Sequence, residues 1–514
     1  MAFKKMRRVI AVLLCAVMLV SCGAQEPSQE EPAPSEEPQV GQPAELSRLT
    51  LGFVPSEGFN PYSSDSILVS QNAGLLIEKL VEITPDMDLE YRLAQSIEST
   101  GERVVIHPRG GCVFADGTPV TADDILASFW AAKSSAMYGG RFADVTDAKV
   151  EEGAVVLTLK NPDSLFAYLC DIPVLKAAEA AQTRPTASGR YTYGSGDQLV
   201  PNDRAAFPEK NLQPIQLTEV AGYDAMTSGL TVGSLNLYAA ADEAEEVPSI
   251  VSHESFYKTN RLVYLGVNAD RPEQPLLSTP QGRSLLSRLL DRRQLAEKSF
   301  YGRAYPATGV INGFYPCVDA GQVILAEQDT AETAAVMASL CYTMDAMSGF
   351  YQDADEQRPS IRLLVYSGNT YKHYAAALIR EQLAAQGIPV ELTEVDDFEL
   401  YRQQIAAGEF DLYIAEVKLY NNMDITPFLA HGALSAGLAQ SEAVTQGYAA
   451  FRANKSAAAA IEQAFAAEMP LIPLVWRSGT VISSRAVSGV VSSVSNIFYS
   501  LEDLALGEPG QTES

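Results

Sequence analysis

The alternation of apolar strands and amphipathic helices over residues 360–415 constrains the fold more than any other feature of this 514-residue chain. The hydrophobic spacing predicts strands at 361–366, 390–392 and 411–415, with helices at 371–386 and 398–407. Gly387 follows the first helix as a C-terminal cap. Because strands separated by helices pair in parallel with right-handed crossovers, this region predicts an α/β fold.

Residues 113–129, VFADGTPVTADDILASF, contain the start of a helix. Asp116-Gly117 is a turn pair. Thr121 is placed to cap a helix, and Asp124 three residues later completes a capping box. Apolar residues then recur at helical spacing, which predicts one buried face. Since every polar residue here has a local structural role, we interpret the segment as scaffold and not as an active site.

The first 22 residues have the features of a secretory signal. Basic residues precede an apolar run from Val9 to Val20, which has the length of a signal's apolar core and not of a membrane span. The run leads into Leu-Val-Ser-Cys, which resembles the lipobox of bacterial lipoproteins and marks Cys22 for lipidation. Two or three acyl chains give a stable anchor. Residues 23–46, rich in Pro and Glu, then predict a disordered acidic tether.

The charge balance and the cysteines restrict the partners. The formal net charge is −27, and it becomes −31 without the four basic residues of the signal. Such acidity disfavours a nucleic acid partner and adsorption onto anionic lipid, so the lipid anchor is the expected membrane contact.

No Cys or His cluster has zinc-ligand spacing, and we expect neither a metal nor a cofactor. For Cys317 and Cys341 a disulfide and two buried thiols are both open.

Six segments, in order along the chain, resemble motifs of the family 5 extracellular solute-binding proteins. That family includes the oligopeptide-, dipeptide- and nickel-binding components of ABC importers. The segments are VFADGTPVTADDILASF at 113–129, LVYLGVN at 262–268, Arg283 with LDR at 290–292, YG with AYPA between 301 and 307, Tyr401 with GEFDL at 408–412, and EMPLIPL at 468–474. Each segment by itself has a plain structural explanation. The resemblance rests on the fact that all six segments occur in the family's order, after a lipobox.

The resemblance implies a two-lobed α/β clamshell of the periplasmic-binding-protein kind, type II, with an enlarged N-terminal lobe. On the family's pattern, lobe I comprises residues 47–260 and 478–514, and lobe II comprises residues 261–477. A small solute, peptide-like by this resemblance, would lie between the lobes and pass to the permease subunits of an ABC importer. The protein is then expected to be a monomer without catalysis, lipid-anchored at the extracytoplasmic face of the bacterial cell membrane.

Candidate ligand residues lie in loops at strand ends, where open α/β sheets bind ligands, and beside the hinge. They are Asn60, Tyr62, Ser63, Tyr420, Asn421, Asn422, Asp424 and Trp476. In peptide binders of the resembled family, an Asp in the segment corresponding to 417–427 pairs with the α-amino group of the substrate. Here Asn421 falls at that place and supplies no charge, and Asp424 is the alternative anchor.

Two other functions stay open. The altered segment around Asn421 would suit a surface sensor or interaction lipoprotein that kept the fold and lost transport. Ser255 and Lys258 match the S-x-x-K spacing of a serine hydrolase, but the companion S-D-N and K-T-G motifs are absent from the sequence. We therefore interpret Ser255 as an ordinary strand residue.

Overall fold

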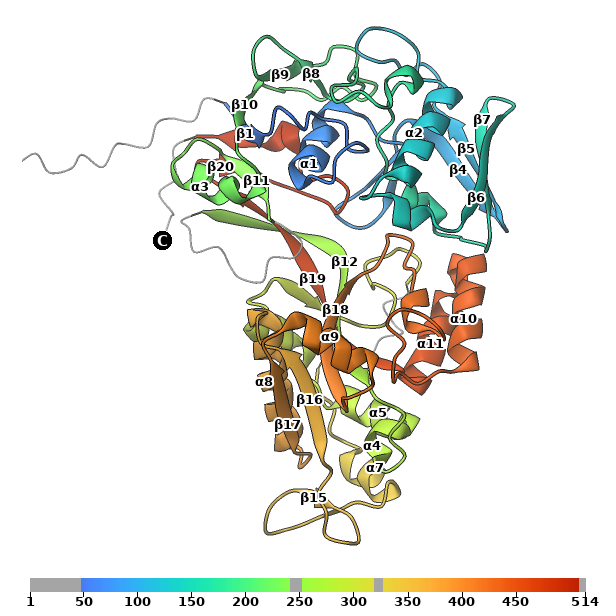
Figure 1. Cartoon of the computed structure of the whole chain (residues 1–514), viewed down its shortest axis with the longest axis vertical. Helices are drawn as coiled ribbons and strands as arrows, with labels where there is room; N and C mark the ends of the chain where they lie inside the picture. The colour runs from blue at the N-terminus through green and yellow to red at the C-terminus, as the bar shows by residue number, and fades with distance from the viewer. Residues whose placement is uncertain (1–47, 241–251, 319–326, 508–514) are drawn as a thin grey trace, which may run out of the picture. The chain divides into compact units, whose positions relative to one another are not determined.

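The computed structural model describes residues 48–240, 252–318 and 327–507 (Figure 1). These residues belong to one unit that spans 45–514. The predicted signal peptide with Cys22 lies outside the described residues, and so does the predicted tether. Within the described ranges, no helix is both long enough and apolar enough to cross a membrane.

The N-terminal elements form two four-stranded sheets. Across the first sheet the strands are β1 (Thr50–Phe53), β10 (Ile215–Glu219), β9 (Gln198–Pro201) and β8 (Tyr191–Tyr193). Across the second they are β4 (Ala94–Thr100), β5 (Arg103–Pro108), β7 (Ala154–Leu159) and β6 (Val145–Glu151). The first sheet contacts helix α1 (Ile67–Leu76), and the second contacts helix α2 (Ala122–Ser134). Only β1 and β10 pair in parallel in these two sheets of the described chain.

The predicted helix start at Thr121 is confirmed. The Thr121 hydroxyl accepts a hydrogen bond from the Asp124 amide at 3.4 Å, and the Asp124 carboxylate accepts one from the Thr121 amide at 2.9 Å. The other Asp124 oxygen accepts from the Ala177 amide at 2.8 Å. The capping box therefore also fastens α2 to a distant loop. This contact supports the interpretation of the segment as scaffold.

The largest sheet has seven strands and continues into the C-terminal half of the chain. In order they are β11 (Leu237–Ala239), β19 (Leu471–Ser483), β12 (His253–Val267), β18 (Leu412–Lys418), β16 (Ile361–Tyr366) and β17 (Val390–Val395), with β13 (Ala304–Pro306) paired to β19. Strand β16 is parallel to both of its neighbours. Helices α8 (Thr370–Ala385) and α9 (Phe398–Ala406) provide the crossovers. The α/β unit predicted at 360–415 is thus confirmed, and Gly387 takes the left-handed conformation of a helix end, with φ 78°.

Strands β12 and β19 are the long antiparallel pair on which this sheet is built (Figure 1). At one end, residues 481–483 of β19 pair with both β11 and β12. At the other end, residues 261–267 of β12 pair with β18. The register shifts between Tyr257 and Arg261, so the ladder is interrupted between these two ends. The lobe boundaries proposed from the sequence, 260/261 and 477/478, fall at this interruption.

One buried cluster contains residues from both halves of the chain. The N-terminal side chains Ile83, Met87, Leu165 and Tyr168 pack with the apolar residues that surround β12, β18 and β19. The Tyr168 ring lies 4.9 Å from the Tyr315 ring, and its hydroxyl donates to the Met87 carbonyl at 3.0 Å. Separate clusters lie under the two N-terminal sheets. The two halves are therefore joined by apolar contact as well as by strands.

The remaining elements are short. The strand pairs are β2 (Val81–Ile83) with β3 (Leu89–Tyr91), β14 (Thr343–Met344) with β15 (Tyr351–Gln352), and β20 (Val487–Ser488) with β21 (Ala505–Leu506). The helices are α3 (Met226–Thr231), α4 (Pro275–Ser278), α5 (Pro280–Arg288), α6 (Arg292–Gln294), α7 (Thr333–Ser339), α10 (Glu442–Ala453) and α11 (Ala458–Glu468).

Apolar residues recur at helical spacing at 71–83 and at 282–297, and both segments form shorter helices than this spacing alone predicts. The pattern at 71–83 ends as a helix at Leu76, because Leu80 and its neighbours pair with other segments as strands. The pattern at 282–297 divides into α5, α6 and a π turn, because the buried Arg292 guanidinium donates to the Ser287 and Pro473 carbonyls. Interior hydrogen bonding therefore overrides the helical spacing at both places.

The cysteines of the described chain carry free thiols. Cys317 is half-buried and Cys341 is exposed. In the structure the two residues form no disulfide, and they are not a pair of buried thiols either.

We expect Glu462→Gln to remove a pH dependence of stability. The Glu462 carboxylate is buried and accepts from the Val310 and Ile311 amides at 3.2 and 2.7 Å, and burial raises its pKa from 4.5 to about 7. Because the folded state disfavours the ionised form, stability is fully present below the unfolded pKa and falls as the pH rises to about 7. The loss by about pH 8 is about 3 kcal/mol.

Urea unfolding at about pH 5 and pH 8 checks this expectation. The difference in unfolding free energy between the two pH values should shrink by about 3 kcal/mol in Glu462→Gln. Glu442→Gln on the exposed surface of α10 is the matched control and should retain the wild-type difference. An unchanged pH dependence in Glu462→Gln would contradict the assignment.

Candidate functional site

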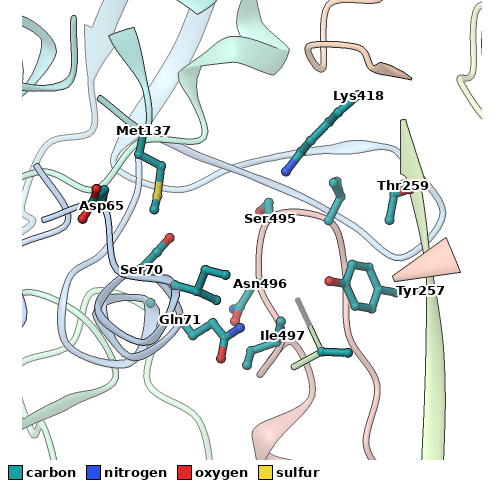
Figure 2. A pocket seen from close by; sticks show the side chains of 14 residues that line it. Asp65, Ser70, Gln71, Met137, Tyr257, Thr259, Lys418, Ser495, Asn496 and Ile497 are labelled. Atoms are coloured by element: carbon teal, nitrogen blue, oxygen red, sulfur yellow. The ribbon is translucent and has the colours of Figure 1, made fainter. Parts of the chain in front are cut away.

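A cavity of about 460 Å³ lies between α1, β12 and the segment 494–497, and we call it the central cavity (Figure 2). Its volume is within the range of small-molecule sites, roughly 300–1,000 Å³. Its polar lining residues are Asp65, Ser70, Gln71, Tyr257, Thr259, Lys418, Ser495 and Asn496. Its apolar lining includes Ile67, Met137 and Ile497. The mixture suits a solute that has both hydrogen-bonding and apolar groups.

The segment 494–497 is fixed in place by partners from the N-terminal elements. The Ser495 hydroxyl accepts from the Ile83 amide at 3.1 Å, and the Ser495 carbonyl accepts from the Lys79 ammonium. The Asn496 side-chain amide donates to Glu82. Burial lowers the pKa of Lys79. Since these contacts are buried or half-buried, this wall of the cavity is preorganised.

The opposite wall is formed by β12 and the end of β18. The Tyr257 ring lies against Gly479 of β19, where an added Cβ would meet the ring at 2.1 Å. Thr259 donates its hydroxyl proton to the Arg477 carbonyl. Lys418 is the last residue of β18, and Figure 2 shows its ammonium directed into the cavity. Glycine at 479 therefore allows Tyr257 to lie where it lines the site.

Two residues before Lys418, Glu416 of β18 forms a buried ion cluster that holds the strands together. The Glu416 carboxylate lies 2.6 Å from Arg261, 3.2 Å from Arg477 and 3.2 Å from Lys372. Burial alone would raise the pKa of Glu416, but the three cations lower it to about 2. The carboxylate is thus ionised at neutral pH and joins β12, β18, β19 and α8.

The candidate residues after β1 have structural roles. Asn60 is fully buried, and its amide group donates to the Ala180 and Gln182 carbonyls at 2.9 and 2.8 Å. Tyr62 donates to the Pro173 carbonyl, and burial raises its pKa. Ser63 is exposed and donates to the Asn60 carbonyl at 3.1 Å. None of Asn60, Tyr62 and Ser63 lines the central cavity, but Asp65, from the same loop, does.

The candidate residues after β18 are also engaged within the protein. The Asn421 side-chain oxygen accepts from Asn260 at 3.0 Å, and its carbonyl accepts from the Tyr315 hydroxyl at 2.7 Å. Asp424 accepts from the Tyr448 hydroxyl at 3.0 Å. Tyr420 is 42% exposed, and its hydroxyl lies against Gly140.

The central cavity is lined by Lys418 and by none of Tyr420, Asn421, Asn422 and Asp424. As ligand contacts, these four residues remain predictions.

Trp476 lies inside the large sheet. It pairs with Leu262 of β12 and Tyr305 of β13, and it is 2% exposed. Its indole N–H has no hydrogen-bond partner among the described residues. The role at the hinge that we expected from the sequence is a prediction that these contacts do not test.

A second polar cluster joins α10 to the N-terminal elements. The Arg452 guanidinium donates to Asp144 at 3.0 Å and to the Pro162 carbonyl at 3.1 Å, and it lies 3.5 Å from Asp163. Asn422 donates to Asp163 at 2.6 Å. Burial raises the pKa of Asp163 to about 6, although Arg452 and Asn422 lower it. Asn422 therefore lies in this cluster and not in the lining of the central cavity.

The described residues do not assemble catalytic chemistry at the positions singled out by the sequence. Ser255 lies in β12 opposite Val481, as expected of a strand residue. The Lys258 ammonium pairs with Asp86 at 2.8 Å and lies 4.5 Å from the Phe314 ring centre. Within the described ranges, no group of three His, Cys, Asp or Glu residues is placed to hold a metal ion.

Comparison with known proteins gives a family match. The sequence pattern described as "Bacterial extracellular solute-binding proteins, family 5 Middle" matches residues 88–432. The nickel-binding protein NikA of Staphylococcus aureus is 24% identical over 163 residues, which are 32% of this chain. The match covers only 29% of the length of that relative.

Solved structures are similar over most of the chain. A nickel ABC transporter structure from Bacillus halodurans has a TM-score of 0.70 and 16% identity, covering 89% of this chain and 99% of that one. A putative peptide-binding protein AppA from Clostridium difficile has a TM-score of 0.63 and 17% identity, covering 90% and 100%. At such identities the likeness shows the fold alone. It confirms the predicted two-lobed α/β clamshell.

We expect Arg452→Met to cost about 3–5 kcal/mol of stability, because it leaves the buried Asp163 carboxylate without its nearest cation. The side chain of Asp163 is only 3% exposed. Denaturant unfolding measures the loss.

The matched control is Arg402→Met on α9, whose side chain is 64% exposed and pairs with Glu399 at 3.4 Å. This change should cost less than about 1 kcal/mol. Combining Arg452→Met with Asp163→Asn should restore part of the loss. Equal losses of unfolding free energy in the two arginine variants would show that Arg452 does not stabilise the contact between α10 and the N-terminal elements.

Proposed function

The chain belongs to the bacterial extracellular solute-binding proteins of family 5, as its sequence resemblance predicted, and we propose that it captures a small peptide-like solute in the central cavity. The solute then passes to the membrane permease of an ABC importer. Members of this family bind solutes and do not transform them, so the protein is not an enzyme. The proposed transport role replaces the serine hydrolase considered from Ser255.

The central cavity is the observation that carries the proposal. Its walls come from α1 and the segment 494–497 on one side and from β12 and the end of β18 on the other. With the lobe boundaries expected from the sequence, Lys418 is the lining residue of lobe II among the described residues, and the other lining residues belong to lobe I. A solute that contacts both walls gains most affinity when the walls approach, and its binding energy therefore selects a closed state that a permease can recognise.

The lining chemistry favours a peptide-like solute. Hydroxyl and amide groups from Ser70, Gln71 and Tyr257 can serve the N–H and C=O groups of a peptide backbone. Ile67 and Met137 offer apolar contact for its side chains. Nickel is named for similar proteins, but among the described residues that line this cavity there is no His or Cys to bind a bare nickel ion.

We expect short peptides to raise the thermal stability of the mature full-length protein. A ligand at about 100 times its dissociation constant stabilises the folded state by about 2.7 kcal/mol. A thermal-shift screen of di- to pentapeptides, oligosaccharides and nickel chelates, followed by calorimetry on the hits, gives the measurement. Stabilisation by oligosaccharides or chelates alone would overturn the peptide assignment, and stabilisation by no solute would favour the alternative of a sensor or interaction lipoprotein.

We also propose that Cys22 carries the lipid anchor, which holds a monomer at the extracytoplasmic face of the cell membrane. The support is the signal sequence and its lipobox. We expect Cys22→Ser to move the protein from the membrane fraction to the soluble extracytoplasmic fraction, because no acyl chain can then be attached. Cell fractionation with mass spectrometry of the first mature peptide measures this, and Cys15→Ser is the control that should stay with the membrane.

A further inference from the structure

We propose that Ser495 and Gln71 recognise the backbone of the bound peptide. The Ser495 hydroxyl donates a hydrogen bond to a peptide carbonyl, and the Gln71 side-chain oxygen accepts one from a peptide N–H. This inference rests on the proposed capture of a peptide in the central cavity and names the residues that make that site specific for peptide bonds. Both side chains line the cavity, Ser495 from the segment 494–497 and Gln71 from α1.

The hydrogen bonds around Ser495 leave one of its groups unused. Its amide donates to the Ser493 hydroxyl at 3.3 Å, its carbonyl accepts from the Lys79 ammonium, and its hydroxyl oxygen accepts from the Ile83 amide at 3.1 Å. A serine hydroxyl also has one proton to donate. Within the described part of the chain, that proton has no acceptor, so Ser495 presents a hydrogen-bond donor at the wall of the cavity.

The segment that carries Ser495 is also fixed at the next residue. The Asn496 side-chain nitrogen donates to Glu82, and its side-chain oxygen accepts from the Phe498 amide at 2.9 Å. With both halves of its amide group engaged, Asn496 holds the shape of the segment. Because the Ser495 hydroxyl is already in place before a solute arrives, binding to it costs little conformational entropy.

Gln71 supplies the complementary acceptor from α1. Its side-chain nitrogen donates to the Ala239 carbonyl at 3.5 Å, which leaves the oxygen of the same amide group as an acceptor. The helix itself is fastened to β1, because the neighbouring Asn72 donates to the Gly52 carbonyl at 2.9 Å. Figure 2 shows Gln71 on α1 and Ser495 on the segment 494–497, the two elements that border this side of the cavity.

A donor and an acceptor on the lining match the two polar groups of a peptide bond. Each peptide unit has one carbonyl oxygen that accepts and one N–H that donates. The cavity is also lined by Ile67 and Met137, which can contact the side chains that flank such a bond. An ester has the carbonyl but no N–H, so it leaves Gln71 without its hydrogen bond. The pair therefore makes the site selective for amide-linked over ester-linked solutes.

Calorimetry with trialanine and four backbone analogues tests this recognition on the mature full-length protein. In two analogues an ester oxygen replaces one of the peptide N–H groups, and in the other two a sulfur atom replaces one of the peptide carbonyl oxygens. Sulfur is a weak hydrogen-bond acceptor. For the wild type, we expect one analogue of each kind to bind about 2- to 10-fold more weakly than trialanine, because one neutral hydrogen bond is lost.

Each variant should remove its own part of this discrimination. Ser495→Ala should bind trialanine about 2- to 10-fold more weakly than the wild type and no longer distinguish it from the sulfur analogue, but it should still discriminate against the ester. Gln71→Met should show the reverse pattern. Ser495→Thr retains a hydroxyl donor and should restore the preference for the carbonyl oxygen. A purely structural role would weaken all forms alike.

The controls are Ser456→Ala and Gln446→Met, which make the same kinds of change at exposed positions outside the cavity lining. Both should bind all five peptides as the wild type does. Thermal melting of each variant confirms that it is folded.

Two results overturn the recognition by Ser495 and Gln71 while leaving peptide capture intact. One is a wild-type protein that binds trialanine and all four analogues equally. The other is loss of affinity for trialanine and its analogues alike in both Ser495→Ala and Gln71→Met. Absence of binding of every peptide form to the wild type, with binding of a nickel chelate or sugar instead, overturns the proposed peptide function itself, and the recognition with it.

Discussion

The antiparallel pairing of β12 with β19 is the interaction on which the rest of the structure depends. At one end of this pair β19 is joined to β11, and at the other end β12 is joined to β18. Because the same two backbones belong to both halves, the halves cannot separate without breaking this ladder. The register shift between Tyr257 and Arg261 leaves the ladder interrupted where the halves meet. At this interruption, side-chain hydrogen bonds join the two strands in place of the backbone ladder.

One of those side chains, Thr259, also lines the central cavity. Thr259 bonds to the Arg477 carbonyl, and Asn260 bonds to Asn421, Asn312 and Tyr315. The Glu416 cluster ties the same strands together from behind. The central cavity lies next to this part of the strand pair, because Tyr257 and Thr259 of β12 and Lys418 of β18 line it. A solute bound there, as we propose, would contact the N-terminal elements and the end of β18, close to the place where the register of the strand pair shifts. Such a position would couple capture of the solute to closure.

The local chemistry of the sequence was a reliable guide to its elements. The α/β unit at 360–415, the cap at Thr121 and the glycine at 387 were all predicted, because spacing, capping and left-handed glycine act over a few residues. The failures have a common cause. The helical pattern at 282–297 is divided because Arg292 donates to the Pro473 carbonyl of β19 and to the Ser287 carbonyl of α5, and no local pattern predicts the partner in β19.

The sequence by itself determined the fold class, because the fold class follows from the order of strands and helices. The strand ends at which it placed the ligand residues remain a prediction. The sequence did not determine which residues near those strand ends face the cavity. Asn60 and Asn421 have the right chemistry for a ligand, but their amide groups are consumed by partners more than a hundred residues away. Asp65 and Lys418 stand a few residues from them and line the cavity. Only the tertiary structure could decide which side chains line the cavity, because the burial and the hydrogen bonding of a polar side chain depend on residues that are distant in the sequence.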